Sequence, residues 1–132
     1  MPDSVVHFEM PAKDKKRVSA FYSKVFGWKM VGAGADMGDY LLGYTADTDE
    51  NGMIRQIGAI NGGFFEYRDE PGFREPHLVI AVKDLDKSIE KVKKEGGEII
   101  GEPMDIKGIG RYISIKDSEG TGIGMLQPNP RG

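Results

Sequence analysis

Hydrophobic and polar positions change their spacing early in the chain, from alternation to a helical repeat. Residues 5–10 alternate and predict a β-strand whose apolar face carries Val6, Phe8 and Met10. Apolar residues then recur at i, i+3, i+4, i+7 and i+8, which predicts an amphipathic helix. The helical set is Val18, Phe21, Tyr22, Val25 and Phe26. The chain therefore opens with a strand followed by a helix.

Polar and glycine residues mark the two ends of this helix. Asp14 is of the type that caps a helix N-terminus, and Gly27 suits the left-handed residue that follows a helix. Glycine-rich turns separate the apolar segments that come next. These segments predict strands at residues 28–31, 40–44 and 54–60.

The same order of elements returns in the second half of the chain. Residues 77–82 predict a strand, Asp84 or Asp86 can cap the next helix, and Gly96 and Gly97 can end it. The apolar stripe of that helix is Leu85, Ile89 and Val92. Strands are expected at residues 98–100, 112–115 and 123–127. Each half thus reads as strand, helix and three strands.

The two halves match at a constant separation of 70 residues from the first strand to the end of the helix. The matched pairs are His7 and His77, Lys13 and Lys83, Asp14 and Asp84, Lys24 and Lys94, and Gly27 and Gly97. Further on, residues 38–40 resemble 110–112, and residues 57–60 resemble 123–126. We therefore predict one domain over residues 1–132, with one module at about 5–66 and another at about 75–128.

The alternation of the first strand of each half places the histidines on the face away from the helix. His7 shares this face with Glu9, and His77 lies on the corresponding face of its own strand. The charged segment 66–76, with two prolines, predicts a linker between the halves. Each module is small, so we expect the two to share one sheet or to pair with a second chain.

Composition excludes several classes of function. The net charge of −3 and scattered basic residues give no basic face for nucleic acid or an anionic membrane. No apolar run is long enough to span a bilayer, and the N-terminus lacks the pattern of a signal peptide. Because cysteine is absent, disulfides, a thiolate nucleophile and Cys-based zinc sites are excluded. A cytoplasmic protein is expected.

Three stretches resemble the glyoxalase, bleomycin-resistance and extradiol dioxygenase superfamily, also called vicinal oxygen chelate proteins. They are residues 6–9, residues 20–28 with the ending Phe-Gly-Trp, and Asp-Ser-Glu-Gly at 117–120. The resemblance implies an α+β fold in which two βαβββ modules form a curved, mixed eight-stranded sheet around a cavity. It also implies a small-molecule ligand, often a divalent metal, and a homodimer.

The resemblance implies that metal ligands come from the first and last strands of each half. His7 and His77 hold the first-strand positions, whereas Gly58 and Gly124 stand at the positions predicted for the usual carboxylates. Two imidazoles with Glu9 as a third ligand could hold Zn, Ni, Fe or Mn. The alternative is that the histidines are polar groups lining the cavity.

Candidate catalytic and substrate-binding residues lie on the same strands. His7 and Glu9 could act as a metal-free acid and base, because a carboxylate beside an imidazole fixes its tautomer. Tyr40 and Tyr112 could line the substrate site, and Arg111 could anchor an acidic group or be an ordinary surface arginine.

Three functional hypotheses follow. The chain could be a glyoxalase-like lyase, isomerase or oxygenase, a non-catalytic binder of the bleomycin-resistance type, or a structural partner with a vestigial cavity. Two weaker motifs are interpreted as loops. Residues 47–52 match half of an EF-hand loop without its closing glutamate, and the glycine-rich residues 32–38 superficially resemble a dinucleotide-binding loop.

Overall fold

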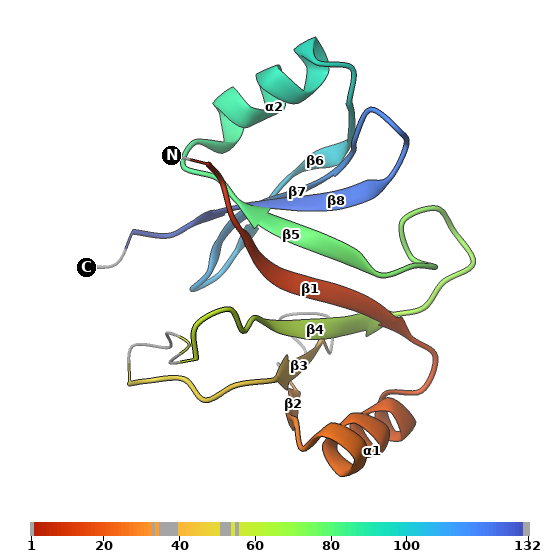
Figure 1. Ribbon diagram of the computed structural model, residues 1–132. Helices are drawn as coiled ribbons and strands as arrows, with labels where there is room; N and C mark the ends of the chain where they lie inside the picture. Colours follow the sequence, from red (N-terminus) through yellow and green to blue (C-terminus); the bar gives the residue numbers. More distant parts are fainter. Residues whose placement is uncertain (1, 33, 35–39, 51–53, 55, 131–132) are drawn as a thin grey trace. The chain divides into compact units, whose positions relative to one another are not determined.

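The computed structural model describes residues 2–32, 34, 40–50, 54 and 56–130. In this part of the chain, two helices and eight strands give the α+β class that the sequence predicted (Figure 1). The chain divides into two compact units. One unit comprises residues 7–76, and the other comprises residues 1–6 together with residues 77–132.

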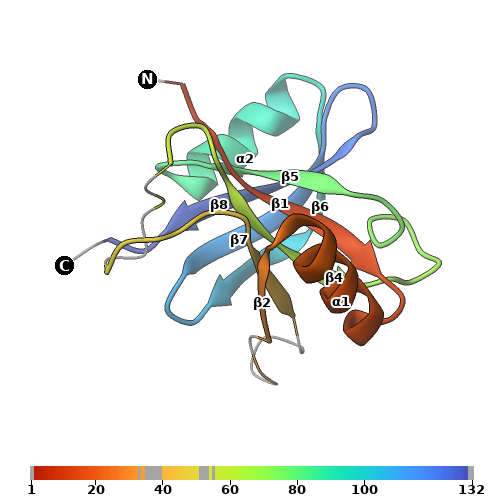
Figure 2. The ribbon, with the colours of Figure 1, turned by 60° about the horizontal axis from the view of Figure 1, so that its bottom comes forward.

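The unit of residues 7–76 contains the first βαβββ module, apart from the first two residues of its first strand. Its elements are β1 (Val5–Ala12), α1 (Lys15–Phe26), β2 (Lys29–Gly32), β3 (Leu41–Tyr44) and β4 (Asn61–Glu66). The strands are ordered β2-β3-β4-β1. β1 runs parallel to β4, and the other two pairs are antiparallel. α1 lies on one face of this sheet (Figure 2).

The other unit repeats this plan. Its elements are β5 (His77–Ala81), α2 (Leu85–Lys94), β6 (Glu98–Ile106), β7 (Gly110–Lys116) and β8 (Gly122–Pro128). The strands are ordered β5-β8-β7-β6, with β5 parallel to β8 and the other pairs antiparallel. Residues 1–6 join this unit, and the N–H of Ala81 donates to the carbonyl oxygen of Ser4 at 2.9 Å.

The two helices begin with the same local structure. Asp14 has φ −139° and ψ 105°, and Asp84 has φ −138° and ψ 104°. Each carboxylate accepts a hydrogen bond from the backbone N–H three residues later, at Arg17 and at Lys87. Gly27 is left-handed at φ 72° and ends α1 as predicted. The predicted caps at Asp14 and Asp84 are therefore confirmed.

Each unit has its own hydrophobic core beneath its helix. In the first module the buried side chains are Ala12, Leu41 and Phe64, and Val18 and Tyr22 of α1 pack against them. In the second module Leu85 of α2 is fully buried. It lies in a core formed with Val82, Ile113, Ile115 and Met125. No described helix is long and apolar enough to cross a bilayer.

The prediction of a strand at residues 54–60 is wrong, because β4 begins at Asn61. A turn precedes it, in which the N–H of Ala59 donates to the carbonyl of Gln56 and Gly58 has φ +88°. The apolar residues of this segment led to the strand prediction, but no period-two alternation supports it. β6 is also longer than predicted and continues past Gly101 through a shift in its register with β7.

Candidate functional site

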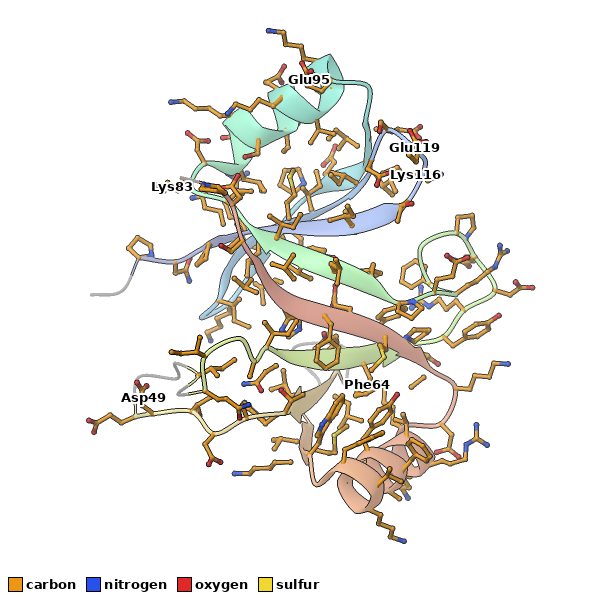
Figure 3. All side chains as sticks on the ribbon, viewed as in Figure 1. Asp49, Phe64, Lys83, Glu95, Lys116 and Glu119 are labelled. Atoms are coloured by element: carbon orange, nitrogen blue, oxygen red, sulfur yellow. The ribbon has the colours of Figure 1, made fainter. Side chains whose placement is uncertain are left out.

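Side chains of the first module divide between the two faces of its sheet as the alternation predicted. Phe8 contacts Trp28 and Met10 packs on the core, so both lie on the side of α1. Figure 3 shows Phe64 on this side, between β4 and α1. Because neighbouring strand residues point to opposite faces, His7 and Glu9 lie on the face away from the helix.

Tyr40 joins His7 and Glu9 on this helix-free face. Its hydroxyl donates to Oε2 of Glu9 at 2.9 Å and lies 3.0 Å from Nε2 of His7. A phenol has one proton, so a hydroxyl that donates to the carboxylate must accept from the imidazole, which places a proton on Nε2. All three side chains are half-buried. The Tyr40 hydroxyl therefore connects the Glu9 carboxylate to the His7 imidazole.

Gly63 makes room for the Tyr40 ring. Gly63 pairs with Glu9 in the parallel ladder, and a Cβ built on it would overlap the ring of Tyr40. Gly62 faces the other way, and a Cβ there would overlap the ring of Phe8. A larger residue at position 63 would therefore displace the hydroxyl that joins His7 and Glu9.

Asn61 completes the polar set and was not predicted. It is the ladder partner of His7, so the two side chains share the helix-free face. Its Oδ1 accepts from the backbone N–H groups of Thr45 and Ala46 at 2.8 and 3.2 Å. The strand predicted at residues 54–60 ended one residue before Asn61. Asn61 would have been recognised as the partner of His7 if the strand had been predicted to begin at Asn61 and to pair with the first strand.

The second module repeats the tyrosine and glycine but not the carboxylate. Gly124 pairs with Val79, and a Cβ on Gly124 would overlap Tyr112. Gly124 therefore corresponds to Gly63 and not to Gly58, which corrects the predicted match between residues 57–60 and 123–126. Val79 occupies the place of Glu9 and is buried at 3% exposure. His77 begins β5, as predicted, and is half-buried.

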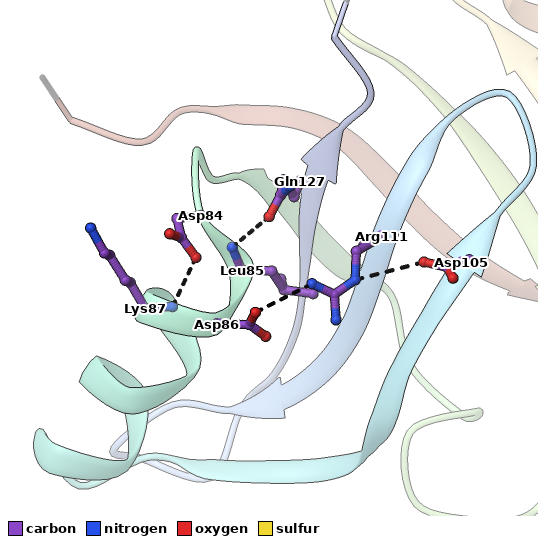
Figure 4. Close-up of polar contacts among 7 residues, drawn as sticks. All are labelled: Asp84, Leu85, Asp86, Lys87, Asp105, Arg111 and Gln127. Carbon is purple, nitrogen blue, oxygen red and sulfur yellow. Dashed lines mark hydrogen bonds and ion pairs between the residues drawn. The ribbon is translucent and has the colours of Figure 1, made fainter.

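Arg111 points to the other side of its sheet (Figure 4). Its guanidinium lies 3.6 Å from Asp86 of α2 and 3.6 Å from Asp105 of β6. Its ladder partner Gln127 accepts a hydrogen bond from the N–H of Leu85 at 2.8 Å. These contacts place Arg111 on the side of α2, opposite Tyr112, and support the alternative that it is a surface ion-pairing residue.

The donor set does not fit the metal site that the family resemblance implied. Among the described residues, no three His, Cys, Asp or Glu side chains lie together as potential metal ligands. Glycine stands at both last-strand positions, and tyrosine rings lie over Gly63 and Gly124.

The two weaker motifs lie partly outside the described residues. These omit positions 51 and 52 of the EF-hand-like segment 47–52 and most of the glycine-rich segment 32–38. In the described part of the first motif, Thr48 forms an isolated antiparallel bridge with Ile54, which lies just beyond the motif.

Sequence comparisons agree with the fold. A family model described as the Glyoxalase/Bleomycin resistance protein/Dioxygenase superfamily matches residues 4–125. Lactoylglutathione lyase GLX1 of Arabidopsis thaliana is 28% identical over 130 residues, covering 95% of this chain and 44% of that protein. A probable lactoylglutathione lyase of Vibrio cholerae is 26% identical over 126 residues, covering 93% of this chain and 89% of that protein.

The chain spans only part of several curated relatives. It covers 21% of CFP32 from Mycobacterium tuberculosis, with 36% identity over 55 residues, and less than half of the Arabidopsis protein. The activities of those whole proteins therefore do not pass directly to this chain.

Solved structures share the fold at low sequence identity. The hypothetical protein BH1468 from Bacillus halodurans aligns with a TM-score of 0.69 and 18% identity, covering 100% of this chain and 99% of that one. Methylmalonyl-CoA epimerase of Streptomyces coelicolor aligns with a TM-score of 0.69 and 15% identity, covering 96% and 97%. At such identities the likeness supports the architecture alone.

Proposed function

The chain belongs to the Glyoxalase/Bleomycin resistance protein/Dioxygenase superfamily, and on that basis we propose that it catalyses proton transfer next to a carbonyl group of a small molecule. One observation carries the proposal. The Tyr40 hydroxyl lies within hydrogen-bond distance of both His7 and Glu9, at 3.0 and 2.9 Å. A carboxylate, a phenol and an imidazole in contact are the groups that move protons at neutral pH.

Glu9 is the proposed base. Its carboxylate takes a proton from the carbon beside the substrate carbonyl, the C–H bond breaks, and the electron pair moves onto the carbonyl oxygen as an enolate. The Tyr40 hydroxyl, which His7 contacts, donates to the carboxylate and holds it in place. Isotope exchange results when the proton on Glu9 is replaced by a solvent deuteron before transfer back to carbon. Protonation of the opposite face of that carbon by a second donor gives epimerisation, whereas loss of a neighbouring leaving group gives a lyase reaction.

The names of the relatives are compatible with this chemistry. Two of the relatives described above are named as lactoylglutathione lyases, one of them as a probable one, and one structural neighbour is named an epimerase. Neither name identifies the substrate of this chain. Tyr40 and Tyr112 remain the predicted substrate-binding residues, and Tyr40 contacts the proposed base.

Isotope exchange tests the proposal without knowledge of the natural substrate. Acetophenone, hydroxyacetone and S-acetylcysteamine are incubated with the protein in D₂O, and exchange of their α-hydrogens is followed by NMR. Glu9→Gln and Tyr40→Phe should each slow the catalysed exchange, with a loss of about a hundred-fold for the base. Glu66→Gln and Tyr67→Phe are matched controls outside the site. Exchange that persists in Glu9→Gln would contradict the proposal.

A non-catalytic binding role is the second candidate. The aromatic rings of Phe65 and Phe73 lie 6.2 Å apart, and Phe65 pairs with Pro11 next to the Glu9 position. Such a pair favours contact with an aromatic ligand. Ligand-detected NMR that finds binding of acetophenone, together with no exchange of any of the three compounds, would favour this role over catalysis.

A further inference from the structure

The carboxamide of Asn61 is held in one orientation by two backbone donors. Its Oδ1 accepts from the N–H of Thr45 at 2.8 Å and from the N–H of Ala46 at 3.2 Å. Backbone N–H groups can only donate, so the atom that they meet must be the amide oxygen. The amide nitrogen, with its two N–H groups, therefore lies on the side away from these donors.

Asn61 stands beside the residues of the proposed acid and base. It faces His7 across the parallel ladder, and the next residue on the same face is Gly63, which lies beneath Tyr40. Adjacent strands are about 5 Å apart, so one small molecule can reach groups on both strands. Asn61 is half-buried, which strengthens a hydrogen bond to an incoming ligand relative to one in water.

We infer that the Asn61 amide nitrogen donates a hydrogen bond to the carbonyl oxygen of the substrate. The inference rests on the proposed function of Glu9, because proton removal from carbon places negative charge on that oxygen. A neutral donor fixed in advance stabilises this charge without reorganising when the charge forms. The substrate class is thereby narrowed to enolisable carbonyl compounds whose oxygen is free to accept, such as ketones and thioesters.

The Asn61→Asp variant distinguishes the loss of the proposed hydrogen-bond donor from a change in the structure around position 61. Aspartate keeps an oxygen acceptor for Thr45 and Ala46 but lacks the N–H groups, so the connection between β3 and β4 retains its hydrogen bonds. Exchange of acetophenone should fall at least ten-fold in this variant, and its thermal midpoint should stay near that of the wild type. Loss of one donor to an oxyanion lowers rates by about a hundred-fold or more in known enzymes.

The pH profile separates loss of a donor from the effect of a new charge. A charge beside His7 would shift the pH at which exchange reaches half its maximum, whereas loss of a donor lowers the plateau itself. Asn61→Ala, which adds no charge, should lower the same plateau. In both variants, the affinity for acetophenone should fall more than that for ethylbenzene, which has no carbonyl oxygen.

Each outcome supports or overturns a defined statement. A lowered plateau in both variants supports donation by Asn61. An unchanged plateau in Asn61→Asp, with exchange lost in Glu9→Gln, overturns the inference and leaves the proposed function standing. Absence of wild-type exchange with acetophenone, hydroxyacetone and S-acetylcysteamine overturns both.

Discussion

The two modules carry the same scaffold with different chemistry at one position. In each, a tyrosine ring lies over a last-strand glycine, at Tyr40 and Gly63 in the first module and at Tyr112 and Gly124 in the second. The first-strand residue paired with that glycine is Glu9 in one module and a buried valine in the other. The repeat therefore preserves the shape of the site while a carboxylate is present in only one copy.

This difference separates what the fold requires from what the function requires. The helix caps, the strand order and the tyrosine over glycine occur in both modules. The hydrogen-bonded set of His7, Tyr40 and Glu9 depends on a carboxylate that the second module lacks. We therefore expect substitutions of the features that occur in both modules to lower stability, and removal of the Glu9 carboxylate to lower activity with a smaller loss of stability.

The largest effects on stability and activity should come from two separate variants, Glu9→Val and Val79→Glu, each of which gives one module the residue of the other. Val79→Glu places a carboxylate at a position with 3% exposure, which should lower the free energy of unfolding by about 3–5 kcal/mol. Glu9→Val should cost only about 1 kcal/mol for the lost hydrogen bond and should abolish isotope exchange. Urea unfolding and the exchange assay measure both. Equal stability losses in the two variants would show that the modules do not differ in this way.

Filling the two glycine positions should have the next largest effect. Gly63→Ala and Gly124→Ala each force a methyl group into a tyrosine ring, which should lower stability by about 1–3 kcal/mol. Gly63→Ala should also impair exchange, since the Tyr40 hydroxyl donates to the proposed base Glu9. Gly32→Ala is the control, because its Cβ would meet open space and should change stability by less than about 0.5 kcal/mol. Losses no larger than that of the control would contradict the tight packing.

The helix caps should respond equally to substitution. Asp14→Ala and Asp84→Ala each remove one hydrogen bond from the first turn of a helix, at an expected cost of about 1 kcal/mol. Asp14→Asn and Asp84→Asn keep the acceptor and should cost a few tenths of a kcal/mol. Thermal unfolding of all four variants measures this. A clear inequality between the two alanine variants would mean that the modules differ in more than their first strands.

Arg111 should have the smallest effect on stability. Its partners Asp86 and Asp105 have side chains 75% and 88% exposed, so solvent screens both ion pairs. Arg111→Met should lower stability by less than about 1 kcal/mol, and added salt should remove the difference. With an acidic ketone such as pyruvate as the exchange substrate, a rise in KM in this variant would instead support the hypothesis that Arg111 anchors an acidic group.

Local signals predicted most of the fold. Asp14, Asp84 and Gly27 act through neighbouring backbone, so their residue types identified the helix ends. The division of His7 and Phe8 between opposite faces followed from alternation alone. The predicted position of β4 was wrong because the consecutive glycines Gly62 and Gly63 are typical of a loop. Glycine inside a strand often marks a close approach of another group, and here that group is an aromatic ring.

The contacts within the site were harder to predict than the face of the sheet on which each side chain lies. His7, Glu9 and Tyr40 were each identified as candidates, but their contact depends on the pairing of β1 with β4 and of β4 with β3. Such registers join residues more than thirty positions apart. Asn61 escaped notice for the same reason, since its alignment with His7 exists only in the parallel ladder. Pairing across long sequence separations leaves no local pattern.

The assignment of residues 1–6 to the unit of residues 77–132 has a practical consequence for dividing the protein. A cut in the linker before His77 would leave the second fragment without Ser4, whose carbonyl accepts from Ala81. A two-piece version would therefore need a duplicated N-terminal segment on the second piece.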